Sequence, residues 1–342
     1  VDRVLDFLWP EDVDAMPAAE REKLLRTPPG ELLKPEDLRA HPELVLYTMD
    51  GTPQVKGQEA GQIREQIKEA FGRLYIPGST IKGAIRTALA RHLVKQKQLN
   101  VAPMPLIQGA KKRERADDRL DAELFRPLTD SANYDLLRAL RVADSEPADT
   151  APILANVRVF RGKTGQSPIE VEAVPARAAF HASLIVDEYL LQEQAGVLGW
   201  KGEHIQAVRN FWVTCQDMAV CQMQKEREFC AASGLDDLAN WYGERLQVLK
   251  QMRGTLECFL RIGWAGGWEN KTLGSKILAA DQEAFTQLRK DFGLGKPPSF
   301  RGAWTPSQEF PRSRRLVVDR MGRPAAPMGW VLVRLEKLKK EE

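Results

Sequence analysis

The part of the sequence that most restricts the fold is residues 74–89, which read LYIPGSTIKGAIRTAL. A short apolar run ends at Pro77-Gly78, which favours a turn, and Ser79 or Thr80 can cap a helix there. Apolar residues then recur with helical spacing, and we expect the helix to run to about Lys97. The sequence therefore predicts a tight turn that leads directly into a long helix.

The start of this helix is a candidate anion-binding site. The first turn of a helix carries unpaired backbone N–H groups and a positive dipole end, and small residues let a phosphate come close. Lys82 and Arg86 share one face and would continue an anionic track. A mononucleotide P-loop does not fit, because Ala84 stands where a Walker motif requires lysine. The candidate contacts are Gly78, Ser79, Thr80, Lys82, Gly83 and Arg86.

A glycine-rich loop at residues 263–274 is a second candidate. Its glycines permit positive φ and close backbone approach, whereas Trp264 and Trp268 can either pack as buried anchors or stack on bases. We favour main-chain contact over base stacking for this loop. The candidate contacts here are Gly263, Gly266, Gly267, Lys271 and Thr272.

Two further clusters of basic residues stand out. The proline-rich segment 296–323 is rich in arginine, and guanidinium groups suit phosphate because of their planar donor geometry. From it we select Arg312, Arg314 and Arg315. The run Lys111–Arg115 is either a solvated loop or a contact for RNA or a partner, and the sequence leaves both open.

These motifs together resemble the RAMP superfamily, the RNA-recognition-motif-like subunits of CRISPR effector complexes. IPGSTIKGAIRTAL is similar to the family signature, Leu140–Ser145 to its strand ending in Asp-Ser, and residues 263–274 to its glycine-rich loop. The tail, at residues 310–316 and 327–330, is similar to the subunit that caps the CRISPR RNA (crRNA) 3′ end in type III-A (Csm) complexes.

The resemblance implies an α+β fold with a ferredoxin-like (RNA-recognition-motif, RAMP) core and a large helical insertion. We expect the core with peripheral helices in residues 1–186, the helical insertion in 187–260, and the glycine-rich loop with the rest of the core in 261–342. RAMP proteins usually begin with a central strand, so the resemblance implies that this strand either lies upstream of Val1 or is missing.

The resemblance also implies a function. We expect a non-catalytic RNA-binding subunit that caps the filament at the crRNA 3′ end and supports crRNA 3′ maturation and assembly. Its implied partners are the 3′ region of crRNA, the neighbouring backbone RAMP subunit and the small helical subunit, with target RNA as a further partner. The alternative is a RAMP-type endoribonuclease acting on crRNA precursor or target. The acids Glu11, Asp12 and Asp14 do not match the aspartate loop of the cleaving relatives, which favours the non-catalytic role.

Composition restricts the class of protein to which the chain can belong. A chain of 342 residues with 43% hydrophobic content can bury a substantial core, and a net charge of +3 means that any RNA surface must come from local clustering of cations. No apolar run is long enough to span a membrane and no signal-peptide pattern occurs, so we expect a cytoplasmic protein without membrane contact. The four cysteines lack C-x-x-C spacing. We therefore expect reduced thiols, no metal and no cofactor.

The remaining elements follow from periodicity. Alternation at residues 157–159, 169–171 and 180–186 predicts an antiparallel sheet, with a hairpin tip at Arg161–Gly165. Apolar stripes predict helices from 187 to 260, and Gly329–Leu335 is strand-like. Near the N-terminus we expect helices at Ala18–Arg26 and Pro35–Ala40, a strand at 44–47 and a helix at 59–70.

Overall fold

The computed structural model describes residues 7–8, 13–54, 63–96, 118–129, 131–166, 168–297, 301–302, 304–306 and 310–337. The basic run Lys111–Arg115 and the acids Glu11 and Asp12 lie outside these residues. The strand expected upstream of Val1 lies outside them as well.

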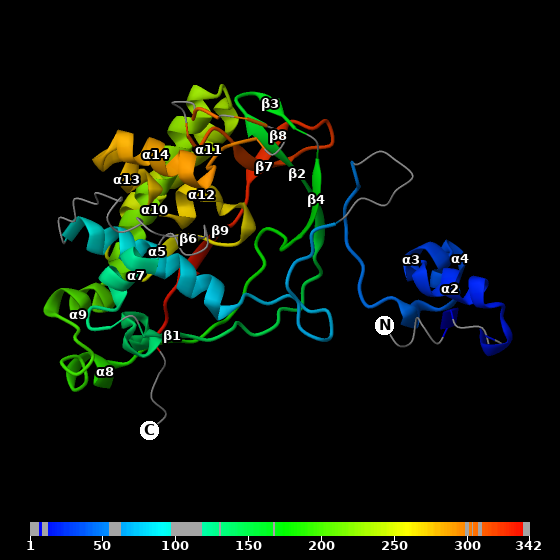
Figure 1. Ribbon diagram of the computed structural model, residues 1–342, viewed down its shortest axis with the longest axis horizontal. Helices are drawn as coiled ribbons and strands as arrows, with labels where there is room; N and C mark the ends of the chain where they lie inside the picture. The colour runs from blue at the N-terminus through cyan, green and yellow to red at the C-terminus, as the bar shows by residue number, and fades with distance from the viewer. Residues whose placement is uncertain are drawn as a thin grey trace.

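Helix α5 (Gly78–Gln96) runs through the middle of the main body, as Figure 1 shows. Its buried residues Ile85, Leu89 and Leu93 recur with helical spacing, and they belong to the largest hydrophobic core. The helix packs against α10 (Phe211–Ala232) and against strand β1 (Leu140–Val142). The helix predicted from the sequence is confirmed as far as Gln96, the last described residue of this range.

Two short antiparallel strand pairs accompany these helices. Strand β1 pairs with β5 (Leu184–Val186), and β6 (Glu257–Arg261) pairs with β9 (Trp330–Arg334). Helix α10 packs on β6. The prediction of a closing strand at 329–335 is confirmed. The expected apolar helical stripe through residues 256–260 is wrong, because helix α11 (Asp236–Gln251) ends earlier and these residues pair with β9.

The largest sheet is organised around strand β2 (Ile153–Arg161). Strands β3 (Thr164–Gly165) and β4 (Ile169–Ala173) pair with β2, β7 (Arg314–Val318) also pairs with β2, and β8 (Pro324–Pro327) extends the sheet beyond β7. All these pairings are antiparallel, and the predicted hairpin tip at 161–165 is confirmed. The third predicted run joins β1 instead of this sheet.

The two faces of this sheet have different surroundings. Phe160, Leu316 and Val318 belong to the main core, whereas Val157, Val171, Ala173 and Ala155 form a smaller cluster against which Val317 and Trp264 pack. Residues that alternate along a strand point to opposite faces, so neighbouring side chains of β7 have different roles. The candidate site described below lies on the face of the smaller cluster, where Trp264 packs.

The segment 187–260 is a structural part of the main body. It contains α8 (Glu188–Gln192), α9 (Gly202–Arg209), α10 and α11, and α10 packs on both α5 and β6. Its buried residues share one core with α5. Beside it lie α7 (Asp118–Phe125), α12 (Gly267–Lys271), α13 (Gly274–Ala280) and α14 (Gln282–Phe292), with short 3-10 turns at η4 (Ala132–Tyr134), η5 (Leu136–Ala139) and η6 (Trp264–Gly266).

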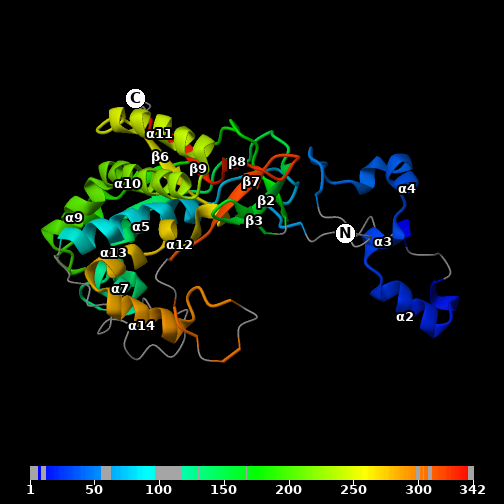
Figure 2. The same ribbon diagram turned by 90° about the horizontal axis from the view of Figure 1, so that it is seen from above.

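The N-terminal helices lie apart from the main body in Figures 1 and 2. They are α2 (Ala18–Arg26), α3 (Pro29–Leu32) and α4 (Pro35–Ala40), with 3-10 turns η1 (Val13–Ala15) and η2 (Pro42–Leu44). Helices α2 and α4 have the predicted bounds. The strand expected at 44–47 is not formed, and residues 63–69, expected to be helical, are extended with bridges from Arg64 to Val171 and from Lys68 to Leu74. Pairing with distant segments overrides the local helical composition there.

Candidate nucleic-acid interface

The N-terminus of α5 is held by the segment that follows β1. The Gly78 N–H donates to Asp144 Oδ1 at 2.7 Å, and the Ile76 N–H donates to Ser145 Oγ at 2.8 Å. A Cβ added at Gly78 would lie 2.3 Å from the carbonyl oxygen of Val142. Gly78 is therefore needed for packing within the chain. The carboxylate of Asp144 also occupies the position in which we expected a phosphate, and this corrects the prediction for Gly78.

Arg86, which we expected to continue an anionic track, is held by two carboxylates. Its Nη2 lies 2.7 Å from Asp121 and 3.0 Å from Asp135, and its Cζ lies 4.0 Å from the centre of the Phe125 ring. Burial works to lower the pKa of Arg86, but hydrogen bonds to Asp135 and Asp121 raise it above the ordinary value. Arg86 therefore joins α5 to α7 and to the start of η5, and this geometry favours a structural role over RNA contact.

The exposed side of the first turns of α5 remains accessible. Ser79 and Gly83 are exposed, and a Cβ added at Gly83 would meet no atom within 4 Å. Burial lowers the pKa of the half-buried Lys82. The backbone N–H of Thr80 is bonded within the turn, at 2.9 Å from the Pro77 carbonyl. Ser79, Lys82 and Gly83 stay predictions as RNA contacts, without the helix N-terminus that motivated the group.

Two glycines of the loop 263–274 have the backbone conformation that the sequence predicts. Gly263 and Gly267 have φ of +76° and +68°, in the region that favours glycine, and a Cβ at either would meet no atom within 4 Å. Gly266 is buried, and its carbonyl accepts a hydrogen bond from Asn270 Nδ2 at 2.6 Å. The backbone at Gly263 and Gly267 is therefore open to a ligand, whereas that of Gly266 is part of the loop's own structure.

The loop is tied to α5 through Arg91. This buried side chain donates to the carbonyl of Thr272 at 2.9 Å and to the carbonyl of Glu269. The carboxylate of Glu269 is in turn 2.5 Å from Lys225 Nζ of α10. The hydroxyl of Thr272 accepts the Gly274 N–H at 3.2 Å. Thr272 is therefore committed to contacts inside the loop.

Trp268 is a packing anchor. Its ring lies 5.7 Å from that of Phe285 and 4.8 Å from that of Phe310. A Cβ added at Gly274 would lie 1.8 Å from the Trp268 ring, so the glycine admits the indole. This position excludes stacking of Trp268 on a nucleic-acid base.

The three arginines expected to act together at the start of β7 lie in different environments. Arg314 points toward the main core, with its Nε 2.9 Å from both carboxylate oxygens of Glu226. Arg315, the next residue of the strand, lies on the opposite face. Burial and the charge of Arg312 lower the pKa of Arg289, so Arg312 lies beside another cation. The expected common function is wrong for Arg314, whose guanidinium neutralises a buried glutamate.

Two cations lie over the Trp264 ring on one face of the large sheet, and a third, Lys271, lies near one of them, Arg315. The Cζ atoms of Arg64 and Arg315 lie 4.7 Å and 4.3 Å from the centre of the Trp264 ring. Burial lowers the pKa of Arg315, and the charge of Arg64 lowers it further. Burial and the charge of Arg315 likewise lower the pKa of Lys271. We call Arg64, Trp264, Lys271 and Arg315 the cation cluster.

The cation cluster has the electrostatic character of an anion site. Within the part of the chain that the structure describes, neither Arg64, Lys271 nor Arg315 forms an ion pair with a carboxylate. Like charges held together without a counter-ion disfavour their own charged forms, and a bound phosphate removes that cost. The cluster brings together Lys271 and Arg315, both predicted from the sequence. It adds Arg64, which the sequence analysis missed because only the long-range bridge to β4 brings it here.

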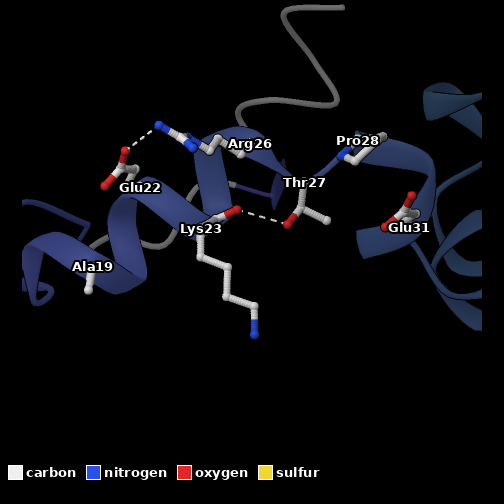
Figure 3. Close-up of a pocket in the computed structure, with 7 residues that line it drawn as sticks. All are labelled: Ala19, Glu22, Lys23, Arg26, Thr27, Pro28 and Glu31. Atoms are coloured by element: carbon white, nitrogen blue, oxygen red, sulfur yellow. Dashed lines mark hydrogen bonds and ion pairs between the residues drawn. The ribbon is translucent and has the colours of Figure 1, made fainter.

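Other features of the described residues are weaker candidates. A shallow hollow on the N-terminal helices is lined by Ala19, Glu22, Lys23, Arg26, Thr27, Pro28 and Glu31 (Figure 3). Its charges already pair in part, with Arg26 2.5 Å from Glu22. Among the residues with described positions, no group of three or more His, Cys, Asp or Glu side chains is placed to hold a metal ion. No helix in these ranges is long and apolar enough to cross a membrane.

Comparison with known proteins points to one family. Residues 46–268 match the model of the RAMP superfamily. Over 135 residues, or 37% of the chain, the sequence is 30% identical to the CRISPR system Cms protein Csm5 of Mycobacterium tuberculosis strains CDC 1551 and H37Rv. That match spans only 36% of the length of these curated relatives.

Solved structures show the same fold over nearly the whole chain. A chain of a Csm–crRNA–target RNA ternary complex of a type III-A CRISPR–Cas system is similar with a TM-score of 0.66 and 26% identity, covering 98% of this chain and 90% of that one. The crystal structure of T. onnurineus Csm5 is similar with a TM-score of 0.58 and 24% identity, covering 97% and 90%. The mixed α/β architecture is therefore that of the Csm5 structures.

Proposed function

The chain belongs to the RAMP superfamily, and from this membership we propose that it is an RNA-binding, Csm5-like subunit of a type III-A CRISPR ribonucleoprotein. The similarity to Csm5 sequences and to a chain of a Csm–crRNA–target RNA complex supports this assignment. Its main ligand would be crRNA, and its partners would be other subunits of the complex.

The observation that carries the proposal is the cation cluster. Phosphate contacts by Arg and Lys supply most of the sequence-independent affinity for nucleic acid. Both guanidinium groups already lie over the Trp264 ring, so a base could stack there only by displacing a cation. The site therefore suits the sugar–phosphate backbone of a guide whose sequence varies. The open backbone at Gly263 and Gly267 lies in the loop that carries Lys271.

The finer role that we propose is to cap the filament at the crRNA 3′ end and to support 3′ maturation without cutting RNA. The similarity of the tail, residues 310–316 and 327–330, to the capping subunit supports the position. The neighbouring backbone RAMP subunit and the small helical subunit would be the protein contacts. The competing function is a RAMP-type endoribonuclease.

We also propose that the core is ferredoxin-like. Two helices, α5 and α10, lie side by side, and they cover the β1–β5 and β6–β9 pairs respectively. A ferredoxin-like sheet would require one further strand that joins the two pairs. The arrangement of two helices on one side of antiparallel strands supports this interpretation.

Assembly of the complex tests the function. The triple variant R64A/K271A/R315A should fold normally but incorporate less crRNA when co-expressed with the other subunits, because three phosphate contacts are removed. The matched control is R334A, which removes an exposed cation paired with Glu257 on another sheet. Normal crRNA content of complexes that contain the triple variant would refute the assignment of the site.

A nuclease assay separates the two functions. The purified chain should leave crRNA precursor and target RNA intact with and without Mg²⁺. Cleavage that disappears when a single residue of this chain is changed would establish the endoribonuclease instead.

A further inference from the structure

The cation cluster depends on a segment that is neither helix nor regular strand. Arg64 lies in the extended residues 63–69, and it is bonded to β4 by two main-chain hydrogen bonds. Its N–H donates to the Glu170 carbonyl, and its carbonyl accepts the Glu172 N–H, both at 2.9 Å. Because Arg64 is bridged to Val171, its side chain lies on the Val171 face of the sheet, where Trp264 packs.

The side chain of Glu172 lies on the opposite face of β4 and forms hydrogen bonds to the same extended segment, residues 63–69. Its Oε2 accepts the Gln66 N–H at 3.0 Å and is also bonded to Lys68 Nζ, while its Oε1 accepts the Tyr47 hydroxyl. Lys68 Nζ lies 4.5 Å from the centre of the Tyr47 ring. The Glu172 side chain is only 3% exposed. We call Tyr47, Lys68 and Glu172 the clamp.

The clamp contains a buried ion pair between Lys68 and Glu172, and its loss should destabilise the segment that it holds. Burial works to raise the pKa of Glu172, but the hydrogen bonds from Lys68, Tyr47 and the Gln66 backbone bring it below the ordinary value. The glutamate therefore stays ionised at neutral pH. Removing one partner of a buried ion pair leaves the other without compensation, so the surrounding segment must rearrange.

We propose that Glu172 is a positioning residue for RNA binding: through the clamp it holds residues 63–68 so that Arg64 stays over Trp264. This inference rests on the proposed function, since Arg64 must contact phosphate for its position to matter. Glu172 itself lies behind the sheet and does not touch RNA. Arg315 comes from β7, which the clamp does not hold.

The experiment measures the affinity of the full chain for a fluorescein-labelled oligouridylate by fluorescence anisotropy. We expect R64A and E172Q each to weaken binding about tenfold, the effect of losing one charge-assisted contact. The double variant R64A/E172Q should bind no more weakly than R64A alone, because both changes remove the same contact. E172Q combined with R315A should weaken binding further than either change alone. The control is E257Q, the same substitution at the exposed Glu257–Arg334 pair.

A second readout follows the cation cluster directly. In protein labelled with 5-fluorotryptophan, the ¹⁹F signal of Trp264, assigned with W264F, should shift in the same way in R64A and in E172Q. The milder variant Y47F keeps the ring and removes one hydrogen bond to Glu172. It should give an intermediate shift and an intermediate affinity, and it keeps the test decisive if E172Q fails to fold.

The outcomes distinguish the inference from the function. If R64A weakens binding while E172Q and Y47F bind as the wild type, the positioning role is overturned and the RNA site stands. Additive losses in R64A/E172Q would also overturn it. If R64A and R315A both bind RNA as the wild type does, the proposed RNA site fails, and the positioning role fails with it.

Discussion

Replacing Arg86 with alanine should destabilise the protein and leave its RNA affinity unchanged. The side chain bridges Asp121 and Asp135 and covers the Phe125 ring, and it is only 29% exposed. The neighbouring cation Lys82, four residues earlier on the same helix, forms no hydrogen bond or ion pair with another described residue. The two positions therefore separate a cation held by ion pairs from a half-buried cation without such a partner among the described residues.

The size of the effect follows from these contacts. A hydrogen bond to a charged group contributes about 1.5–3 kcal/mol, and the contact with the Phe125 ring adds about 0.5–1 kcal/mol. Both aspartates keep a second partner, since Asp121 lies 3.3 Å from Arg126 and Asp135 accepts the Leu137 N–H at 2.9 Å. Partial exposure lowers the total further. We therefore expect R86A to lose about 3 kcal/mol of unfolding free energy, and K82A less than about 0.5 kcal/mol.

Urea unfolding followed by circular dichroism measures the unfolding free energy of each variant. Titration with RNA at several salt concentrations measures its RNA affinity. R86A should show wild-type RNA affinity at temperatures at which it is folded. The reasoning would be refuted by an R86A variant of unchanged stability whose RNA affinity falls and whose log–log salt slope drops by about 0.7, the value for one lost phosphate contact.

Other consequences are equally direct. G78A should destabilise the chain by about 3 kcal/mol or more, because the new methyl group meets the Val142 carbonyl, whereas G83A should stabilise it by about 0.5–1 kcal/mol, because its Cβ enters open space on a helix. Thermal unfolding of both variants checks this, and shifts of the same sign would contradict it. The lowered pKa of Glu172 means that its contribution to stability is present above the ordinary glutamate value of 4.5 and is lost as the pH falls through the lowered value. The stability difference between wild type and E172Q should therefore be constant near neutral pH and shrink in acid, and a difference independent of pH would exclude this role of the carboxylate.

Local patterns in the sequence predict the elements that depend on local physics. The turn at Pro77-Gly78, the helix α5 and the hairpin around Gly162 follow from turn residues and periodicity. The short helices α2 and α4 also have the predicted bounds. Residues 63–69 are different, because their composition suits a helix and only the contacts with Glu172 and β4 make them extended.

The candidate site shows the same division. Residue type selected Lys271 from the glycine-rich loop and Arg315 from the arginine-rich tail as separate candidates, and only the fold brings the two into one cation cluster. Residue type could not distinguish Arg315 from Arg314, since their difference depends on which face of β7 meets Glu226. The sequence also could not predict that the Asp144 carboxylate binds the N-terminus of α5, because Asp144 is 66 residues away from Gly78 in the chain.

The most direct test of the proposed RNA site is the salt dependence of binding to single-stranded RNA by R64A, K271A, R315A and the triple variant. Each single change should reduce the slope of log K against log salt by about 0.7, and the triple variant should reduce it by about 2. The loss should be the same for RNAs of different sequence, because only the backbone is contacted. Wild-type slopes in all four variants, or losses that depend on the RNA sequence, would contradict the proposal that this chain holds the RNA backbone at the cation cluster.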